Sequence, residues 1–411
     1  MKKRQAAIGI IGMGAAGSMA GIAAAEAGAD VALFDGNEKL GKKIYITGKG
    51  RCNVTNATTL PEFMEGLARH PRFLYSALDH WTNEETMRFF ESHGLPLKVE
   101  RGQRVFPVSD KASDVNRVLE RTLRKAGAAL YFHHKVTHVE RKEDGFRLYF
   151  ETEKPFDVTR LIIATGGKSY PSTGSTGDGF RFARALGHTV TPLFPSLVPL
   201  DLEDDVTPWE GISLKNVALH FEGEREFGEL VFTHTGISGP IVLTLAARLA
   251  DTNVAGKTLE LDWKPALDAE ALKARLIRER EKGPNRSLKT LLETLLPKRV
   301  VPLFVWRGGW DESLPIHSLT REREREIIEQ LKHFSFTARS WGRFEQAVVT
   351  RGGVEVKEVN PKDLSSKKVD GLYFAGEVLD VDAKTGGYNL QIAFSTGHLA
   401  GTAAAAATRN E

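Results

Sequence analysis

The chain has 411 residues, of which 41% are hydrophobic and 27% are charged. At about 150 residues per domain, this length predicts two or three domains, and the ordinary globular composition excludes a disordered chain and a membrane bundle. The formal net charge of +3 is spread along the chain, so it indicates no nucleic-acid partner. The single cysteine, Cys52, excludes an intramolecular disulfide and fits a reducing compartment, so we expect a cytoplasmic protein.

The N-terminus imitates a signal peptide, because Lys2, Lys3 and Arg4 precede an apolar stretch from Ala6 to Ala25. Glycines interrupt this stretch at a spacing that a nucleotide-binding turn explains better. No window reaches the roughly 18 uninterrupted apolar residues of a spanning helix. We therefore expect neither a secretion signal nor a membrane segment or membrane partner.

Residues 6–11 (AAIGII) are typical of a buried strand, and the following GMGAAG leads into an alanine-rich segment that suits a helix ending at Gly28. A second apolar run, DVALFD, ends in Asp35, which lies 23 positions after Gly12. A strand, a glycine turn, a helix and an acid at this distance are the pattern of a dinucleotide-binding unit. A structural glycine turn without a ligand is the alternative.

Each glycine of GMGAAG has an expected role. Gly12 allows the tight turn, Gly14 lets the backbone approach a pyrophosphate, and Gly17 lets the helix pack on the strand. The helix N-terminus stabilises the phosphate charge. A carboxylate at Asp35 accepts hydrogen bonds from a ribose 2′-hydroxyl and repels a 2′-phosphate, which favours FAD or NAD over NADP. The contacts predicted for this unit are Gly12, Met13, Gly14, Ala15, Ala16, Gly17 and Asp35.

Residues 41–56, GKKIYITGKGRCNVTN, are too rich in glycine and polar residues for a helix, and we expect an extended loop there. Its cations, hydroxyls and amides suit phosphates or an electron-rich ring, although a solvated basic loop would have the same composition. The preceding segment 36–42 copies the start of a phosphate-binding P-loop, but Lys43 replaces the Ser or Thr that magnesium needs. A nucleotide triphosphatase is therefore disfavoured.

The stretch TGKGRCNVTN resembles the signature of the aminoacetone-oxidase-like FAD enzymes, also called bile-acid enone reductase-like or NAD(P)/FAD-dependent oxidoreductases. Four later stretches resemble the same family in the same order, so the resemblance covers essentially the whole chain. Asp35 departs from it only in replacing a more usual Glu. The four stretches are LIIATGGKSYPSTGSTGDG (161–179), FTHTGISGP (232–240), TRGGV (350–354) and GLYFAGEVLDVDAKTGGYNLQIAFSTG (371–397).

The resemblance implies an α/β fold, in which a Rossmann-like FAD-binding domain of the glutathione-reductase type carries an inserted β-barrel domain and a small helical insert. The glycine fingerprints stop between about 190 and 345, which agrees with an insertion. We expect a discontinuous FAD-binding domain at 1–190 and 345–411. The β-barrel, as a substrate or roof domain, is expected at 191–262 and 316–344, and the helical insert at 263–315. The charge run at 321–333 is expected to be a solvated helix face.

Two further apolar runs, LIIATGG and GLYFAGE, read as strands that end in glycine, where open α/β sheets bind ligands. We expect both strands to flank the first strand. We expect the segment HHKVTHVE (133–140) to form the remaining strand of the cofactor sheet. Asn389 should lie near the N-cap of a closing helix. We expect the FAD to be non-covalent, since no residue stands out as a covalent anchor. The resemblance implies that Val136 contacts the adenine. It adds these predicted cofactor contacts: Lys43, Thr47, Gly48, Arg51, Cys52, Asn53, Val136, Ala164, Thr165, Gly166, Gly376, Glu377, Gly387, Asn389 and Leu390.

His234, in FTHTGISGP, is the histidine that we nominate as a catalytic acid or base, the alternative being a turn that orders the barrel. His134 and His138 lie four positions apart in a predicted strand, about 13 Å. This is too far for a shared metal ion. No metal site is expected.

A bound flavin would perform the redox step, so few catalytic side chains are expected. A second GxGxxG motif is missing from the sequence, so any NAD(P)H would bind transiently, and one cysteine cannot form a redox dithiol. We expect a small organic substrate. The activity that we rank first is oxidation of an amine such as aminoacetone, with oxygen as the electron acceptor, and the alternative is NAD(P)H-dependent reduction of an enone. A non-catalytic flavin-binding module, in sensing or RNA modification, and a simple NAD dehydrogenase are the remaining alternatives. The oligomeric state stays open.

Overall fold

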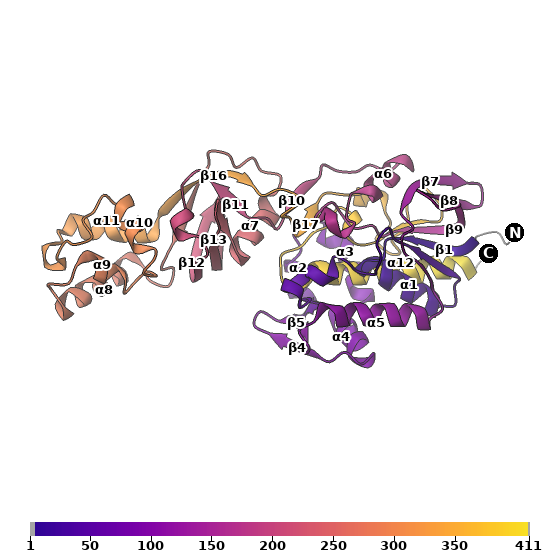
Figure 1. Ribbon diagram of the computed structural model, residues 1–411, viewed down its shortest axis with the longest axis horizontal. Helices are drawn as coiled ribbons and strands as arrows, with labels where there is room; N and C mark the ends of the chain where they lie inside the picture. Colours follow the sequence, from indigo (N-terminus) through magenta and orange to yellow (C-terminus); the bar gives the residue numbers. More distant parts are fainter. Residues whose placement is uncertain (1–4, 410–411) are drawn as a thin grey trace. The chain divides into compact units, whose positions relative to one another are not determined.

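The computed structural model describes residues 5–409, so the basic residues Lys2, Lys3 and Arg4 lie outside the described part. The chain divides into two units, each with its own hydrophobic core (Figure 1). Unit 1 combines the residues up to Ser196 with those from Arg343 onward, and unit 2 is Leu197–Gly342. The polypeptide therefore leaves unit 1 once and returns to it.

Unit 1 is built on a mainly parallel sheet in which β1 lies between β2 and β9. The side chains of β2 are all buried, as expected of a parallel strand covered on both faces. β6 pairs with β2, and β18 pairs with β9; β8 and β7 continue the sheet in antiparallel fashion. The strands are β6 (Ala129–Tyr131), β2 (Val31–Phe34), β1 (Gln5–Ile11), β9 (Phe156–Ile163), β18 (Leu372–Phe374), β8 (Gly145–Phe150) and β7 (Val136–Lys142).

One prediction about strand neighbours is wrong. β18 pairs with β9 and not with β1, because β2 and β9 already occupy both edges of β1. The strand expected at 133–140 is present in this sheet as β7, although it begins only at Val136. β6, which pairs with β2, was not predicted. β6 has three half-buried residues, so it leaves no long apolar run that a sequence pattern could show.

Helices α1 (Ala15–Glu26) and α12 (Tyr388–Arg409) pack against each other beside this sheet (Figure 1). A Cβ on Gly397 would lie 2.2 Å from the carbonyl oxygen of Ala16, and one on Gly401 would lie 2.2 Å from that of Ala20. The small residues of α12 therefore allow backbone contact with α1. The other elements of unit 1 are β3 (Thr55–Asn56), α2 (Leu60–Glu65), α3 (Pro71–His80), α4 (Asn83–Ser92), β4 (Leu97–Glu100), β5 (Arg104–Pro107), α5 (Ala112–Lys125), α6 (Asp178–Ala185), β10 (Phe194–Ser196) and β17 (Val349–Arg351).

Unit 2 contains a closed barrel, in which each strand hydrogen-bonds to two neighbours. Trp209 and Trp263 meet edge to face in its core, with their ring centroids 5.7 Å apart. In order around the barrel, the strands are β11 (Leu200–Leu202), β14 (Gly236–Ser238), β13 (Glu224–Phe232), β12 (Ser213–Phe221), β15 (Thr258–Asp262) and β16 (Phe334–Trp341).

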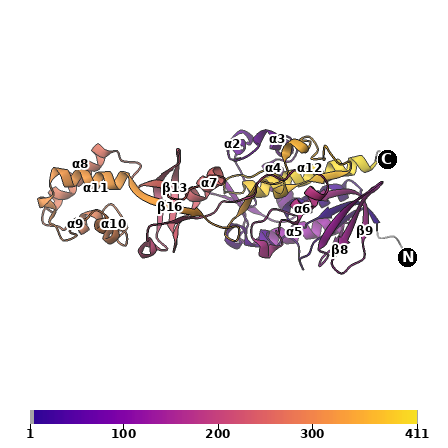
Figure 2. The ribbon, with the colours of Figure 1, turned by 90° about the horizontal axis from the view of Figure 1, so that it is seen from above.

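The helices of unit 2 are α7 (Pro240–Leu249), α8 (Ala269–Lys282), α9 (Leu288–Leu292), α10 (Val301–Arg307) and α11 (Arg321–Lys332). Figure 2 shows α8 to α11 grouped together. The charge run at 321–333 forms α11, which begins after the capping side chain of Thr320 and buries Ile327 and Leu331 on one face. Within residues 5–409, no helix is long and apolar enough to cross a membrane.

Candidate active site

The three glycines of the turn after β1 differ in what surrounds them. Gly12 has a φ of 101°, and a Cβ there would lie 2.5 Å from the carbonyl oxygen of Ala164 at the end of β9. A Cβ on Gly17 would lie 1.9 Å from the carbonyl oxygen of Gly12, whereas one on Gly14 would meet no atom within 4 Å. Gly12 and Gly17 therefore close the turn, and Gly14 faces open space.

The start of α1 keeps its backbone N–H groups available. Gly14 is the N-cap, and the helix has neither a capping side chain nor an acidic residue in its first turn. Unpaired N–H groups at a helix N-terminus attract anions. Open space beside uncapped N–H groups fits a pyrophosphate.

Asp35 is fixed beside this turn at the end of β2. Its Oδ2 accepts a hydrogen bond from the backbone N–H of Met13 at 2.8 Å, and its Oδ1 accepts from the backbone and side chain of Asn37, both at 2.9 Å. The backbone N–H of His134 donates to the carbonyl oxygen of Asp35 at 2.8 Å. This hydrogen bond places the segment that leads to Val136 next to Asp35. Asp35 and the start of β7 thus meet at one end of the predicted nucleotide site.

Residues 41–56 are not the extended loop predicted from their composition. Turns lead into a 3-10 helix, η1 (Ile44–Gly50), which is kinked where Gly48 and Lys49 adopt φ values of 57° and 58°. The hydroxyl of Thr47 donates to the carbonyl oxygen of Ile44 at 2.7 Å. Short-range hydrogen bonds and left-handed glycines compact the segment, and residue composition alone does not reveal them.

Cys52 and Asn53 lie inside this compact segment. Cys52 is fully buried, and burial raises the pKa of its thiol to about 12, so the side chain is a neutral thiol. The Oδ1 atom of Asn53 is buried and has no hydrogen-bond partner within residues 5–409. A buried acceptor without a donor is costly, and a cofactor N–H would satisfy it.

Arg51 is engaged elsewhere. Its guanidinium forms ion pairs with Glu100 and Asp110, and it lies 4.1 Å from the ring centroid of Phe106. Hydrogen bonds to Glu100 and Asp110 raise the pKa of Arg51. Its predicted contact with the cofactor stays a prediction.

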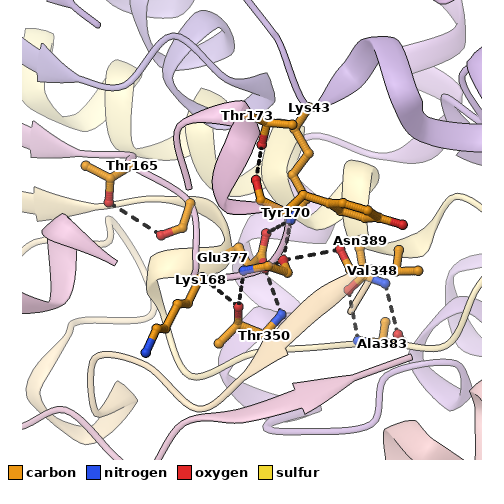
Figure 3. Close-up of polar contacts among 12 residues, drawn as sticks. Lys43, Thr165, Lys168, Tyr170, Thr173, Val348, Thr350, Glu377, Ala383 and Asn389 are labelled. Carbon is orange, nitrogen blue, oxygen red and sulfur yellow. Dashed lines mark hydrogen bonds and ion pairs between the residues drawn. The ribbon is translucent and has the colours of Figure 1, made fainter. Parts of the chain in front are cut away.

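A polar cluster surrounds Glu377, directly after β18 (Figure 3). The ammonium of Lys43 lies 2.8 Å from Oε2 of Glu377 and 2.6 Å from the hydroxyl of Ser169. Ser169 donates to Oε1 of Glu377 at 2.9 Å, and the backbone N–H of Thr350 donates to the same oxygen at 2.7 Å. Three other segments of the chain therefore converge on the carboxylate of Glu377, so that four segments meet in this cluster.

Sequence reasoning missed Ser169, Thr350 and Gly167 as parts of this cluster. A Cβ on Gly167 would lie 2.4 Å from the hydroxyl of Thr350 and 2.6 Å from Oε1 of Glu377, so glycine is required there. All three residues lie in the GGKSYP and TRGGV stretches, which carried the family resemblance. Their positions in those motifs were the available signal.

The ends of β9 and β18 bring further predicted contacts to the glycine turn. Gly376 has a φ of 77°, and a Cβ there would lie 2.7 Å from the Cβ of Ala16. Gly166, with a φ of 74°, follows Ala164 and Thr165 after β9. Gly376 therefore lies beside the start of α1, and Ala164 and Thr165 lie beside Gly12.

Asn389 lies near the N-cap of α12, as predicted. It is the second residue of that helix, and its side chain accepts from the backbone N–H of Ala383 at 3.0 Å and donates to the carbonyl oxygen of Ala383 at 2.9 Å. It thus fixes the preceding loop. Gly387, with a φ of 99°, precedes the helix and would place a Cβ 2.3 Å from the carbonyl oxygen of Thr55. The helix start, followed by Leu390, lies against the end of segment 41–56.

His234 belongs to unit 2, between β13 and β14. Its side chain is 70% exposed and lies 3.0 Å from a carboxylate oxygen of Glu210. Its catalytic role stays a prediction. The residues described by the structure contain no group of three His, Cys, Asp or Glu side chains that could hold a metal ion.

Comparison with known proteins decides the family. The model of the HI0933-like protein Rossmann domain matches residues 6–403. The chain belongs to the HI0933-like family. This membership agrees with the sheet, the glycine turn and the barrel described above, and it confirms the predicted Rossmann-like FAD-binding fold.

Curated relatives of this HI0933-like protein match over nearly its whole length. It is 34% identical to the 3-dehydro-bile acid delta(4,6)-reductase of Clostridium scindens, over 97% of this chain and 98% of that protein. It is 32% identical to the ribosomal RNA dihydrouridine synthase of Haemophilus influenzae, over 95% of this chain and 96% of that protein. A solved quinol fumarate reductase subunit of Escherichia coli is 16% identical, with a TM-score of 0.53 over 100% of this chain and 71% of that one. That last likeness concerns the fold alone.

The predicted enzyme class is confirmed at this level: the protein is an FAD-dependent oxidoreductase. This sets aside the non-catalytic flavin-binding module. The open cradle at Gly14, the uncapped start of α1 and the unpaired Oδ1 of Asn53 all fit such a cofactor.

Proposed function

We propose that this protein reduces a carbon–carbon double bond conjugated to a carbonyl group, with NAD(P)H as the electron donor. The observation that carries the proposal is the shared chemistry of its relatives' names. Dihydrouridine is uridine with its conjugated ring double bond saturated, and a delta(4,6)-reductase saturates ring double bonds. The relatives with these names match 94% to 97% of this chain.

The residues of unit 1 divide the binding of FAD between them. Gly14 and the start of α1 would hold the pyrophosphate, and Asp35 the adenosine ribose. Lys43, Glu377 and segment 41–56 would hold the part of the cofactor nearer the flavin ring. When bound and reduced, FAD supplies a hydride. The protein's part is to orient the substrate, exclude water and provide a proton.

Electron supply follows from two features of the chain. The sequence has one GxGxxG turn of the dinucleotide type and one cysteine, and Cys52 is buried as a neutral thiol. Neither a second nucleotide domain nor a dithiol is present in this sequence to pass electrons on. We therefore propose that NAD(P)H binds transiently and delivers its hydride directly.

A uracil ring in ribosomal RNA is a second candidate substrate, favoured by the two relatives named ribosomal RNA dihydrouridine synthase. An RNA substrate would contradict the expectation, based on the charge distribution alone, that the protein binds no nucleic acid. Oxidation of an amine by oxygen, which the family resemblance placed first, stays a prediction that the same experiment addresses.

The test uses the purified protein loaded with FAD, under nitrogen, with NADH or NADPH. Three substrates are offered separately: a 4-en-3-one steroid, a simple cyclic enone and an unmodified ribosomal RNA transcript. Products are examined by mass spectrometry for the gain of two hydrogens. Aminoacetone is tested in air, with hydrogen peroxide as the readout.

We expect reduction of at least one conjugated substrate and no peroxide formation from aminoacetone beyond the rate without substrate. Reduction of the RNA alone would identify the second candidate as the substrate. Peroxide formation from aminoacetone without reduction of any conjugated substrate would overturn the proposal and establish amine oxidation. Gly14→Val, which places a side chain in the open cradle, is the control that should lose the cofactor and every activity.

A further inference from the structure

Two carboxylates, Asp380 and Asp382, lie in the loop between η6 (Gly376–Val378) and α12. Their exposed fractions are 0% and 1%. The binding of FAD proposed above uses neither of them. Because a buried carboxylate is costly unless it is paired or protonated, each must have a specific environment.

Asp380 is paired with two basic side chains that reach the surface. Its Oδ1 lies 3.1 Å from Nε of Arg69, and its Oδ2 lies 3.4 Å from Nε2 of His70. The side chains of Arg69 and His70 are 28% and 31% exposed. Asp380 therefore lies between solvent-accessible groups and the interior.

Asp382 has a less complete environment. Its Oδ2 accepts a hydrogen bond from the hydroxyl of Ser196 at 3.0 Å, and its Oδ1 has no hydrogen-bond partner in the described part of the chain. Burial raises the pKa of Asp382 to about 6, an effect opposed by the charges of Arg351 and Arg69 and reinforced by that of Asp380. Near neutral pH this carboxyl group can both hold and release a proton.

The backbone connects Asp382 to the polar cluster around Glu377. Ser196, which binds Asp382, lies in β10 and pairs with Val349 of β17. The next residue of β17 is Thr350, which donates its backbone N–H to Glu377. On its other side Asp382 is followed by Ala383, which Asn389 binds at the start of α12 (Figure 3). Asp382 thus lies next to both segments that border the proposed cofactor site.

We propose that Asp382 is the proton donor of the reduction. This inference rests on the proposed function, because saturation of a conjugated double bond requires one hydride and one proton. The hydride brings both electrons of the new C–H bond at the β-carbon, and the π pair shifts toward the carbonyl. The O–H bond of Asp382 then breaks, its proton forms the second C–H bond at the α-carbon, and Asp382 is left as a carboxylate. A proton from solvent then restores the acid form of Asp382.

The test compares Asp382→Asn with the matched variant Asp380→Asn, both loaded with FAD. We expect kcat for reduction of the substrate identified above to fall at least about 100-fold in Asp382→Asn, the lower range for a lost general acid. Reduction of the bound cofactor by NAD(P)H, which precedes the proton step, should be unchanged. Asp382→Glu should recover part of kcat. In the wild type, kcat should fall as the pH rises through about 6, because the protonated form is the active one.

A measurement independent of turnover is the infrared carbonyl band of a protonated carboxyl group. It should disappear with a midpoint near pH 6 in the wild type and at a lower pH in Asp380→Asn, which removes a charge that raises the pKa of Asp382, and it should be absent from Asp382→Asn. Wild-type kcat in a folded, FAD-loaded Asp382→Asn protein would overturn the inference. So would equal losses in both Asn variants with an unchanged pH profile, which would indicate a structural role. If the wild type reduces no conjugated substrate, the proposed function fails, and with it the role of Asp382, whatever the infrared band shows.

Discussion

The glycine turn at 12–17 and the polar cluster around Glu377 belong to the same unit but are built from different kinds of contact. The turn and Asp35 lie within 24 consecutive residues, and their hydrogen bond spans 22 positions. The contact between Lys43 and Glu377 spans 334 positions. The glycine turn and its contact with Asp35 are therefore encoded locally, whereas the polar cluster around Glu377 exists only once distant segments of unit 1 have folded together.

The largest expected effect is a loss of stability that distinguishes Gly17 from Gly14 in the glycine turn. Gly17→Ala would place a Cβ 1.9 Å from a backbone oxygen that cannot move away easily. We expect it to lower the free energy of unfolding by about 3 kcal/mol or more, at the upper range for overpacking. Urea unfolding of the FAD-free protein measures this loss.

The matched control is Gly14→Ala, whose Cβ would meet no atom within 4 Å. Its φ of −79° suits alanine, so we expect its stability without FAD to change little. Its affinity for FAD should fall at least about tenfold, or about 1.4 kcal/mol. Equal stability losses in both variants would contradict the distinction between closing glycines and an open one.

The next effect concerns the pH dependence of stability contributed by Asp382. Its pKa is raised from 3.8 to about 6 in the folded protein, so its contribution to stability is full below the unfolded pKa and is lost as the pH rises through about 6. Between about pH 4.5 and about pH 7.5, the wild type should lose about 2 kcal/mol relative to Asp382→Asn. Parallel stability curves for the two proteins over this range would show that the carboxyl group titrates normally.

A smaller effect tests whether the polar cluster acts as a unit. Lys43→Met and Glu377→Gln each remove one side of an ion pair whose side chains are 22% and 19% exposed. A double-mutant cycle should give a coupling of about 1 kcal/mol in the free energy of unfolding without FAD. As a control, the exposed pair Arg124 and Glu120 should give a coupling of about 0.3 to 0.5 kcal/mol. A coupling between Lys43 and Glu377 no larger than in this control would mean that the four segments meet without depending on one another.

The comparison also explains what the sequence could predict. Spacing identified β1, the glycine turn, α1 and Asp35, because one short segment contains all the contacts that define them. Ser169 and Thr350 were missed because they matter only through Glu377, more than 20 positions away.

Errors in the sequence analysis have two origins. Composition could not show that Thr47 and Gly48 compact residues 41–56 through short-range contacts. The partner of β18 depended on which strand edges were already occupied, and this is decided by tertiary structure, where local propensity is a weak guide.

The smallest expected effect is that of His234→Ala in unit 2. The histidine is 70% exposed and its partner Glu210 is 53% exposed, and exposed ion pairs contribute about 0 to 1 kcal/mol. We expect almost no change in stability and, if Asp382 supplies the proton, a kcat within about threefold of the wild type. A loss of about 100-fold or more at unchanged stability, with wild-type turnover retained in Asp382→Asn, would transfer the acid role to His234.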